Sequence, residues 1–103
     1  MSMKRLKDGR LLAVWNPIPM YNGRTVADGI WARNPLAMAI SSDNGESFTA
    51  PVLLEEDPGS AYGYTAIHET QDGSVLLAYC AGSTEDECML NRLRIRKISP
   101  EEI

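Results

Sequence analysis

The sequence contains few of the residues that build metal centres, disulfide frameworks and membrane spans. It has one histidine, His68, and two cysteines, Cys80 and Cys88. Because a metal site needs several such ligands together, we expect neither a metal nor another cofactor. A pair of cysteines does not form a disulfide framework, so the two either stay reduced or pair with each other across a loop. No apolar run approaches the roughly 18 residues of a membrane span, and residues 1–8 are too polar to open a signal peptide, which leaves the compartment open.

The chain also lacks an excess of positive charge. Lysine and arginine number 10 against 14 aspartates and glutamates, which gives a formal net charge of -4. Since binding to nucleic-acid phosphates requires a basic face, a nucleic-acid partner is not expected. One basic cluster alternates with the apolar residues Leu93 and Ile95. This alternation predicts that the basic residues lie on the solvent side of a strand: Arg92, Arg94, Arg96 and Lys97.

What the chain does contain is a series of short apolar segments separated by turn residues. No segment carries apolar residues at the spacing of a helix over a useful length, so the predicted fold class is all-β. The loop over 20–33 is long for a compact chain and is expected to be either functional or disordered. Strands are predicted over six ranges: 10–16, 34–40, 49–55, 64–70, 75–80 and 89–98.

An internal repeat organises these strands. Residues 72–79 (DGSVLLAY) repeat residues 8–15 (DGRLLAVW), a shift of 64 positions (72 − 8). Repeated strand meanders that cannot bury both of their faces alone are typical of propeller blades. Residues 1–103 are therefore predicted to form about two four-stranded blades, one over about 3–56 and one over about 61–99. The first strand of the first blade is either truncated or drawn from residues 3–7, and the second copy lacks a fourth strand.

A polar turn with the pattern Ser-x-Asp-x-Gly-x-x-aromatic lies between two of the predicted strands. It consists of Ser41, Asp43, Gly45 and Phe48. An aspartate at the head of such a turn accepts hydrogen bonds from later backbone N–H groups, and a glycine can take a positive φ. The pattern is that of an Asp box. The alternative is an ordinary polar hairpin loop, which needs only the Asp-Asn-Gly tripeptide; the strands on both sides favour the Asp box.

The order of these motifs resembles the sialidase (neuraminidase) superfamily, in particular the C-terminal portion of bacterial sialidase-like proteins with Asp-box (BNR) repeats. The resemblance covers about residues 8–98. It implies a six-bladed β-propeller, of which this chain carries the last two blades. It further implies exo-hydrolysis of terminal sialic acid from glycans with retention of configuration, through a tyrosine nucleophile. The motifs that carry it are 33–36 (RNPL), the Asp box, 51–54 (PVLL), 64–67 (YTAI) and 72–73 (DG).

The resemblance also implies roles for two residues. Tyr64 resembles the nucleophile, with Tyr62 as the competing candidate, and Arg33 resembles the third of three arginines that hold the substrate carboxylate. A phenol nucleophile avoids the repulsion between a carboxylate nucleophile and that substrate carboxylate. The alternatives are a half-buried strand tyrosine and a surface arginine. The Asp box is implied to be structural only, and the partner of the intact protein is implied to be a sialic-acid-like glycan.

The sequence departs from the family pattern at the remaining catalytic positions. The general-acid aspartate, the glutamate that activates the tyrosine and the first two arginines belong to earlier blades. An unassisted phenol is a poor nucleophile at neutral pH, so the chain alone is expected to be inactive. The leading hypothesis is a C-terminal fragment of a sialidase-like glycoside hydrolase. The alternatives are a non-catalytic propeller or carbohydrate-binding module, and a structural piece that self-associates through its exposed blade edges.

Overall fold

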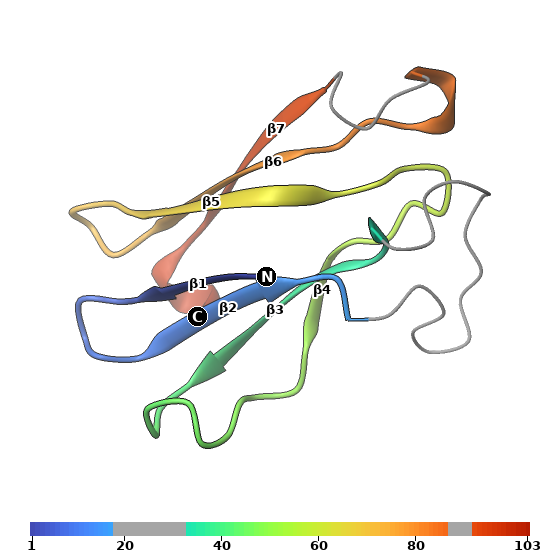
Figure 1. Cartoon of the computed structure of the whole chain (residues 1–103). Coiled ribbons are helices and arrows are strands. Elements are labelled where there is room, and N and C mark those ends of the chain that lie inside the picture. Colours follow the sequence, from blue (N-terminus) through green and yellow to red (C-terminus); the bar gives the residue numbers. More distant parts are fainter. Residues whose placement is uncertain (18–32, 87–91) are drawn as a thin grey trace.

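The computed structural model describes residues 1–17, 33–86 and 92–103, which form two antiparallel sheets (Figure 1). Within these ranges there is no α-helix and no helix that could cross a membrane; the 3-10 turns include η3 (Thr84–Asp86) and η5 (Pro100–Glu102). The all-β prediction is therefore confirmed. The first sheet has the order β1 (Ser2–Arg5), β2 (Leu11–Trp15), β3 (Leu36–Ser41) and β4 (Val52–Glu55); the second has β5 (Gly63–Glu69), β6 (Val75–Cys80) and β7 (Leu93–Ile98).

The predicted strands occur where the sequence placed them, with small changes at their ends. The strand predicted over 49–55 begins only at Val52, and the first strand of the first sheet is β1. Two predictions fall largely outside the described residues: the long loop over 20–33, of which only Arg33 is described, and the start of the strand over 89–98. Cys88 also lies outside them, so the expectation that it and the half-buried Cys80 stay reduced, with pairing as the alternative, remains a prediction.

The two copies of the repeat form equivalent hairpins. In the turn before β2, the Asp8 carboxylate accepts a hydrogen bond from the backbone N–H of Arg10, and Gly9 has a φ of 96°. In the turn before β6, Asp72 accepts from the N–H of Ser74, and Gly73 has a φ of 84°. The Asp-Gly pair thus supplies both the acceptor and the positive φ that these tight turns require.

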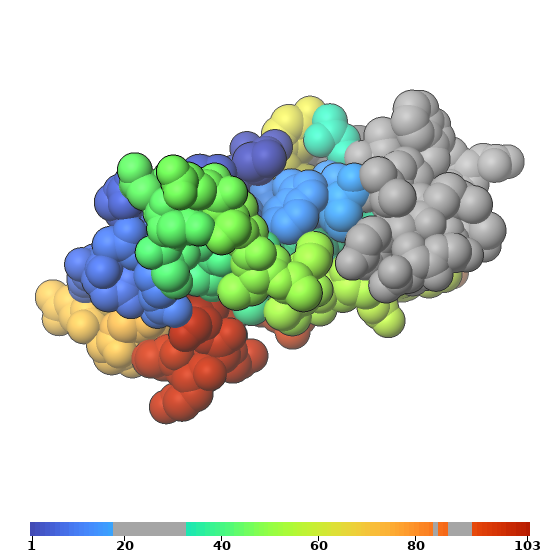
Figure 2. Space-filling model, turned by 90° about the horizontal axis from the view of Figure 1, so that it is seen from below, coloured from blue at the N-terminus to red at the C-terminus, as the bar shows by residue number. Residues whose placement is uncertain are grey.

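The two sheets pack face to face around one apolar core. Successive residues of a strand point to opposite faces, so alternate positions enter the core. On β2 these are Leu12 and Val14, and on β6 they are Val75, Leu77 and Tyr79. Residues from β3, β4 and β7 complete the cluster, and the C-terminal Ile103 packs against it; Figure 2 shows this C-terminal segment (red) beside the first sheet (blue and green).

The first strands of the two sheets, β1 and β5, lie side by side (Figure 1). The Ser2 hydroxyl donates a hydrogen bond to the carbonyl oxygen of Thr65 at 2.6 Å. Further along, the Glu69 carboxylate accepts one from the backbone N–H of Lys7 at 2.7 Å. These bonds join two sheets whose backbones do not share a ladder.

Strand β7 contradicts the predicted orientation of the basic cluster. Arg94 and Arg96 are on the side of β7 that faces the first sheet: Arg94 forms an ion pair with Glu55 at 2.8 Å, and Arg96 donates to the carbonyl oxygen of Leu54. Leu93 and Ile95 are on the opposite side, with exposed fractions of 72% and 64%. The predicted side was therefore wrong for Arg94 and Arg96, although both remain exposed, whereas Lys97 lies on the outward side as predicted. Alternation separates the two faces of a strand but does not indicate which of them another sheet covers.

Candidate functional site

The structure brings Arg33 and Tyr64 together. The guanidinium carbon of Arg33 lies over the ring of Tyr64, 5.1 Å from the ring centroid, which is the geometry of a cation–π contact. Arg33 directly precedes the segment that leads into β3, and Tyr64 is near the start of β5. Two residues separated in sequence by two strands and the Asp box therefore share one surface.

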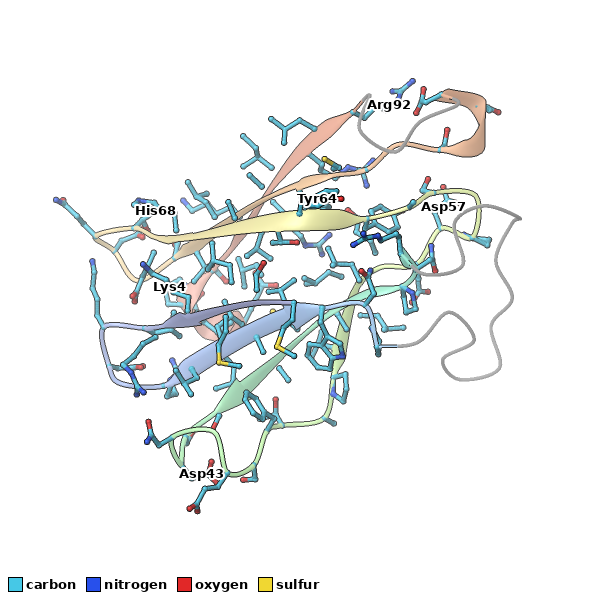
Figure 3. The ribbon with its side chains drawn as sticks, viewed as in Figure 1. Lys4, Asp43, Asp57, Tyr64, His68 and Arg92 are labelled. Atoms are coloured by element: carbon cyan, nitrogen blue, oxygen red, sulfur yellow. The ribbon has the colours of Figure 1, made fainter. Side chains whose placement is uncertain are left out.

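The backbone at Tyr64 explains why this side chain points outward. The pairing of β5 with β6 shifts its register between Gly63 and Ala66, and Tyr64 has a φ of 53°. A bulge of this kind bends the strand and re-aims a side chain, and a positive φ is costly for a bulky residue unless the surroundings enforce it. As a result, Tyr64 is 68% exposed although it lies within the hairpin of β5 and β6 (Figure 3).

Two asparagine side chains hold the backbone around this pair. The buried amide of Asn34 donates to the carbonyl oxygens of Asp57 and Ser60, at 2.7 and 2.9 Å. The amide of Asn16 donates to the carbonyl oxygens of Pro35 and Tyr62, at 2.9 and 3.2 Å. The carbonyl oxygen of Arg33 itself accepts from the N–H of Tyr62 at 2.8 Å. Sequence reasoning assigned no role to either asparagine, although each precedes a proline and Asn34 belongs to the 33–36 motif that carries the family resemblance.

The hollow beside Arg33 and Tyr64 is small. Its volume is about 30 Å³, and Asn16, Trp15 and Thr65 contribute to its walls. That is room for about one water molecule, whereas ligand pockets usually enclose about 300 Å³ or more. The described residues therefore make one wall of a site that could take a sugar only with further walls.

Tyr62, the competing nucleophile candidate, is in a different environment. It is 1% exposed, and its ring meets that of Tyr79 edge to face with centroids 6.3 Å apart. Burial raises the pKa of the Tyr62 phenol. A substrate could not reach this phenol without opening the core, so Tyr64 is the accessible member of the pair.

A tyrosine–carboxylate pair lies between the sheets, and no motif in the sequence indicated it. The hydroxyl of the buried Tyr79 donates to Glu55 at 2.5 Å, and Arg94 donates to the same carboxylate oxygen at 2.8 Å. Burial and the hydrogen bond to Glu55 raise the pKa of Tyr79. We call these three residues the inter-sheet clamp, because they join β4 to β6 and β7. With its phenol enclosed, the clamp stabilises the fold rather than meeting a substrate.

The predicted Asp-box residues form a closed turn away from Tyr64, with Asp43 near its tip (Figure 3). Asp43 accepts hydrogen bonds from the hydroxyl of Ser41 and from the backbone N–H and hydroxyl of Ser47. The buried Ser41 hydroxyl in turn accepts from the N–H of Gly45, whose φ is 94°. Phe48 follows the turn on the outside of the first sheet. Ser41, Asp43 and Gly45 are therefore occupied in shaping the turn.

Hydrogen bonding to these turn aspartates should make the fold sensitive to acid. Bonds from Ser47 and Ser41 lower the pKa of Asp43 to about 2, and bonds from Thr70 and Ser74 lower that of Asp72 to about 2. A folded-state pKa below the unfolded value of 3.8 contributes stability above pH 3.8, and this contribution is lost as the pH falls toward 2. We expect the urea midpoint to fall over this window, and Asp43→Asn to lower it at neutral pH and to flatten the acid decline. A Ser42→Ala variant of the same turn should keep the wild-type profile; an Asp43→Asn profile identical to it would contradict this role.

No group of three or more His, Cys, Asp or Glu side chains in the described part of the chain could hold a metal ion. Glu69, the acidic residue of β5, is at the opposite end of that strand from Tyr64. The surface that Arg33 and Tyr64 share thus offers one cation and one phenol. Such a surface can bind a carboxylate and present a nucleophilic oxygen, but the general acid has to come from elsewhere.

A family model described as BNR repeat-like domain matches residues 1–77. The match includes Arg33, Tyr64 and the Asp box, and it ends within the second copy of the repeat. No curated protein and no solved structure matches the chain.

Proposed function

This chain belongs to the BNR repeat-like domain family, and from that premise we propose that it is the closing portion of a sialidase-like glycoside hydrolase. The proposed reaction is removal of a terminal sialic acid from a glycan with retention of configuration. The observation that carries the proposal is the contact between Arg33 and Tyr64, 5.1 Å from guanidinium carbon to ring centroid. The family resemblance assigns these two residues to one substrate, and adjacent side chains are what such a shared role requires.

The arrangement of the two sheets supports the proposal that they are neighbouring blades of a propeller. Both sheets are antiparallel meanders in sequence order, and their first strands β1 and β5 lie beside each other. Blades that surround an axis share this arrangement, with successive sheets packed face to face. The six-bladed closure implied by the resemblance needs further blades besides these two.

In the proposed mechanism, Arg33 binds the carboxylate that sialic acid carries beside its anomeric carbon. A planar guanidinium can donate two parallel hydrogen bonds to a carboxylate, which orients the sugar as well as holding it. The phenol oxygen of Tyr64 then bonds to the anomeric carbon as the glycosidic bond breaks, and water later hydrolyses the glycosyl–tyrosine bond. The leaving oxygen takes its proton from an aspartic acid, and a glutamate receives the phenol proton; both residues are expected on other blades.

Without those partners, the 103-residue chain should bind the sugar weakly and not hydrolyse it. We expect sialic acid to shift the NMR resonances of Arg33 and Tyr64 in the isotope-labelled chain, while a neutral amino sugar leaves them unchanged. Arg33→Ala should weaken this binding at least about tenfold, because the carboxylate loses its charged donor. Arg10→Ala is the matched control, since Arg10 pairs with Asp8 in the turn before β2, remote from the site. Equal shifts from the neutral sugar, or unchanged binding in Arg33→Ala, would count against the proposal.

A non-catalytic carbohydrate-binding module is the second candidate. It requires only the surface that Arg33 and Tyr64 share, and none of the acid, the activating glutamate and the two further arginines of the family pattern. The two candidates share the expected binding and differ in turnover. If the chain binds the sugar, and a protein that also carries the proposed earlier blades does not hydrolyse the sialoside, the binding module is the correct candidate.

A further inference from the structure

We propose that this chain associates head to tail with other copies of itself through two unlike apolar faces. The first outer face is the side of the first sheet turned away from the core, with Met1, Met3, Trp15, Phe48 and Pro51. The second outer face is the corresponding side of the second sheet, which is apolar at Ala66, Leu76, Ala78, Leu93 and Ile95 and carries His68 and Lys97 on either side of Leu76. The proposal concerns faces rather than strand edges, and it does not depend on the proposed catalysis. It applies to the 103-residue chain by itself, because the proposed earlier blades would cover these same two faces in a protein that carries them.

Within the chain, faces equivalent to these two already pack against each other in the core. Positions that face the core in one copy of the repeat face outward in the other. Leu12 and Val14 of β2 are in the core, whereas their repeat equivalents Leu76 and Ala78 are on the second outer face. The reverse holds for Ala13 and Trp15, which line the first outer face, and their equivalents Leu77 and Tyr79, which are in the core. The interface inside the chain therefore joins unlike faces of equivalent sheets, as a heterologous interface does.

Strands β3 and β7 are also equivalent in the repeat, and their equivalent residues differ in exposure. Met38 pairs with Val14, and Ile95 pairs with the equivalent Ala78, so Met38 and Ile95 are repeat equivalents. Leu36 and Leu93, each two residues earlier, form the next pair. Leu36 and Met38 are 1% and 4% exposed, whereas Leu93 and Ile95 are 72% and 64% exposed. The second sheet thus presents in the open the side chains that the first sheet buries against a neighbour.

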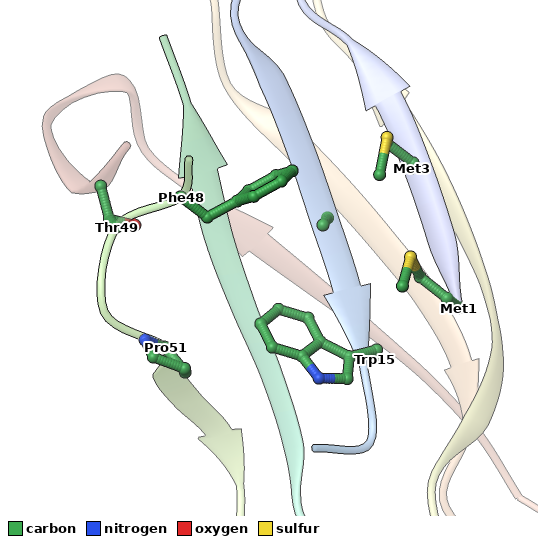
Figure 4. A pocket seen from close by; sticks show the side chains of 7 residues that line it. Met1, Met3, Trp15, Phe48, Thr49 and Pro51 are labelled. Carbon is green, nitrogen blue, oxygen red and sulfur yellow. The ribbon is translucent and has the colours of Figure 1, made fainter. Parts of the chain in front are cut away.

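The first outer face is hollowed to receive such side chains. The hollow has a volume of about 260 Å³. In Figure 4, Met3 and Met1 lie on one side of it, Phe48 and Pro51 on the other, and Trp15 between them. Its walls are almost wholly apolar, so sugar hydroxyls or charged groups would find few hydrogen-bond partners there. Methionines adapt their shape to branched aliphatic side chains. Leu93 and Ile95 of another copy fit this chemistry, and they would repeat the contact that joins the two sheets within one chain.

Sedimentation of the whole 103-residue chain provides the first part of the test. We expect the mass to rise beyond that of a dimer between low micromolar and near-millimolar concentration, because a heterologous contact leaves a free face at each end. A monomer throughout this range would overturn the proposal, and so would a mass that stops at the dimer, the result of a face pairing with itself.

Complementary variants provide the second part. One carries Met3→Glu and Phe48→Glu on the first outer face, and the other carries Leu93→Glu and Ile95→Glu on the second. Each alone should raise the dissociation constant at least about tenfold and sediment as a monomer. Their mixture should form a one-to-one dimer and nothing larger, because each variant supplies the intact face that the other lacks. Association of either variant alone, or no association in the mixture, would overturn the proposal.

A matched control shows whether the effect is specific to the two faces or follows from changing any exposed apolar residue. Val52 is 51% exposed, close to Met3 at 50%, but it pairs with the core residue Met38 and so lies on the other side of the first sheet. Val52→Glu should associate like the wild type. Serine versions of the four face substitutions, checked by circular dichroism, supply the same mixing test if a glutamate variant does not fold.

Discussion

Tyr64→Phe is expected to abolish sialoside turnover in a protein that joins this chain to the proposed earlier blades. The substitution removes the nucleophilic oxygen and keeps the ring, so the stacking with Arg33 can persist. Loss of a covalent nucleophile should lower kcat by at least about a thousandfold, with a smaller change in substrate binding. Release of the fluorescent aglycone from a fluorogenic sialoside measures kcat and KM directly.

Tyr62→Phe is the matched control for that experiment. It removes the same atom two residues earlier, from a phenol that is buried rather than exposed. We expect this variant to lose some stability and to keep a kcat close to that of the wild type. If Tyr62→Phe were inactive and Tyr64→Phe active, both correctly folded, the assignment of the nucleophile would be reversed.

Glu55→Ala is expected to lower the free energy of unfolding more than a substitution of Arg94, the other residue of the inter-sheet clamp that solvent reaches. It leaves the buried Tyr79 hydroxyl without its acceptor and Arg94 without its partner. An unsatisfied buried hydroxyl costs about 1–3 kcal/mol, and the half-exposed ion pair adds less than about 1 kcal/mol. We therefore expect the free energy of unfolding to drop by about 2–3 kcal/mol in urea titrations.

Two variants show whether the acceptor itself is responsible. Glu55→Gln keeps an oxygen that can accept from Tyr79, so most of the stability should return. Glu56→Ala changes the exposed neighbouring glutamate and should stay within about 0.5 kcal/mol of the wild type. Equal losses in Glu55→Ala and Glu56→Ala would show that the clamp does not stabilise the contact between the sheets.

The strands and turns could be predicted because their causes are local. The strand Val75–Cys80 follows an Asp-Gly turn and consists of apolar residues favoured in strands, and the structure ends it where the sequence did. The repeat likewise predicted two similar hairpins. Such local patterns predict strands and turns without information about which segments pack against them.

The orientation of β7 and the surroundings of the site could not be predicted, because they depend on contacts between distant segments. Alternation separates Arg94 from Ile95 but does not reveal which side meets the first sheet. The bond between Tyr79 and Glu55 joins residues 24 positions apart, and Asn34 reaches Ser60 across 26. The exposure of Tyr64 follows from a bulge and a positive φ that its sequence does not mark. The nearness of Arg33 and Tyr64 was expected only from the family resemblance.

Covalent trapping tests the proposed role of Tyr64 most directly. A fluorinated sialic acid with a fluoride leaving group forms its bond to the nucleophile normally, but the second fluorine slows hydrolysis of that bond. Mass spectrometry of peptides from the treated protein, with the earlier blades present, then locates the attached sugar. The expected result is one sugar on Tyr64 and none on Tyr62, with labelling lost in Arg33→Ala. A protein that turns over the sialoside yet carries the label on any other residue would contradict the proposed site.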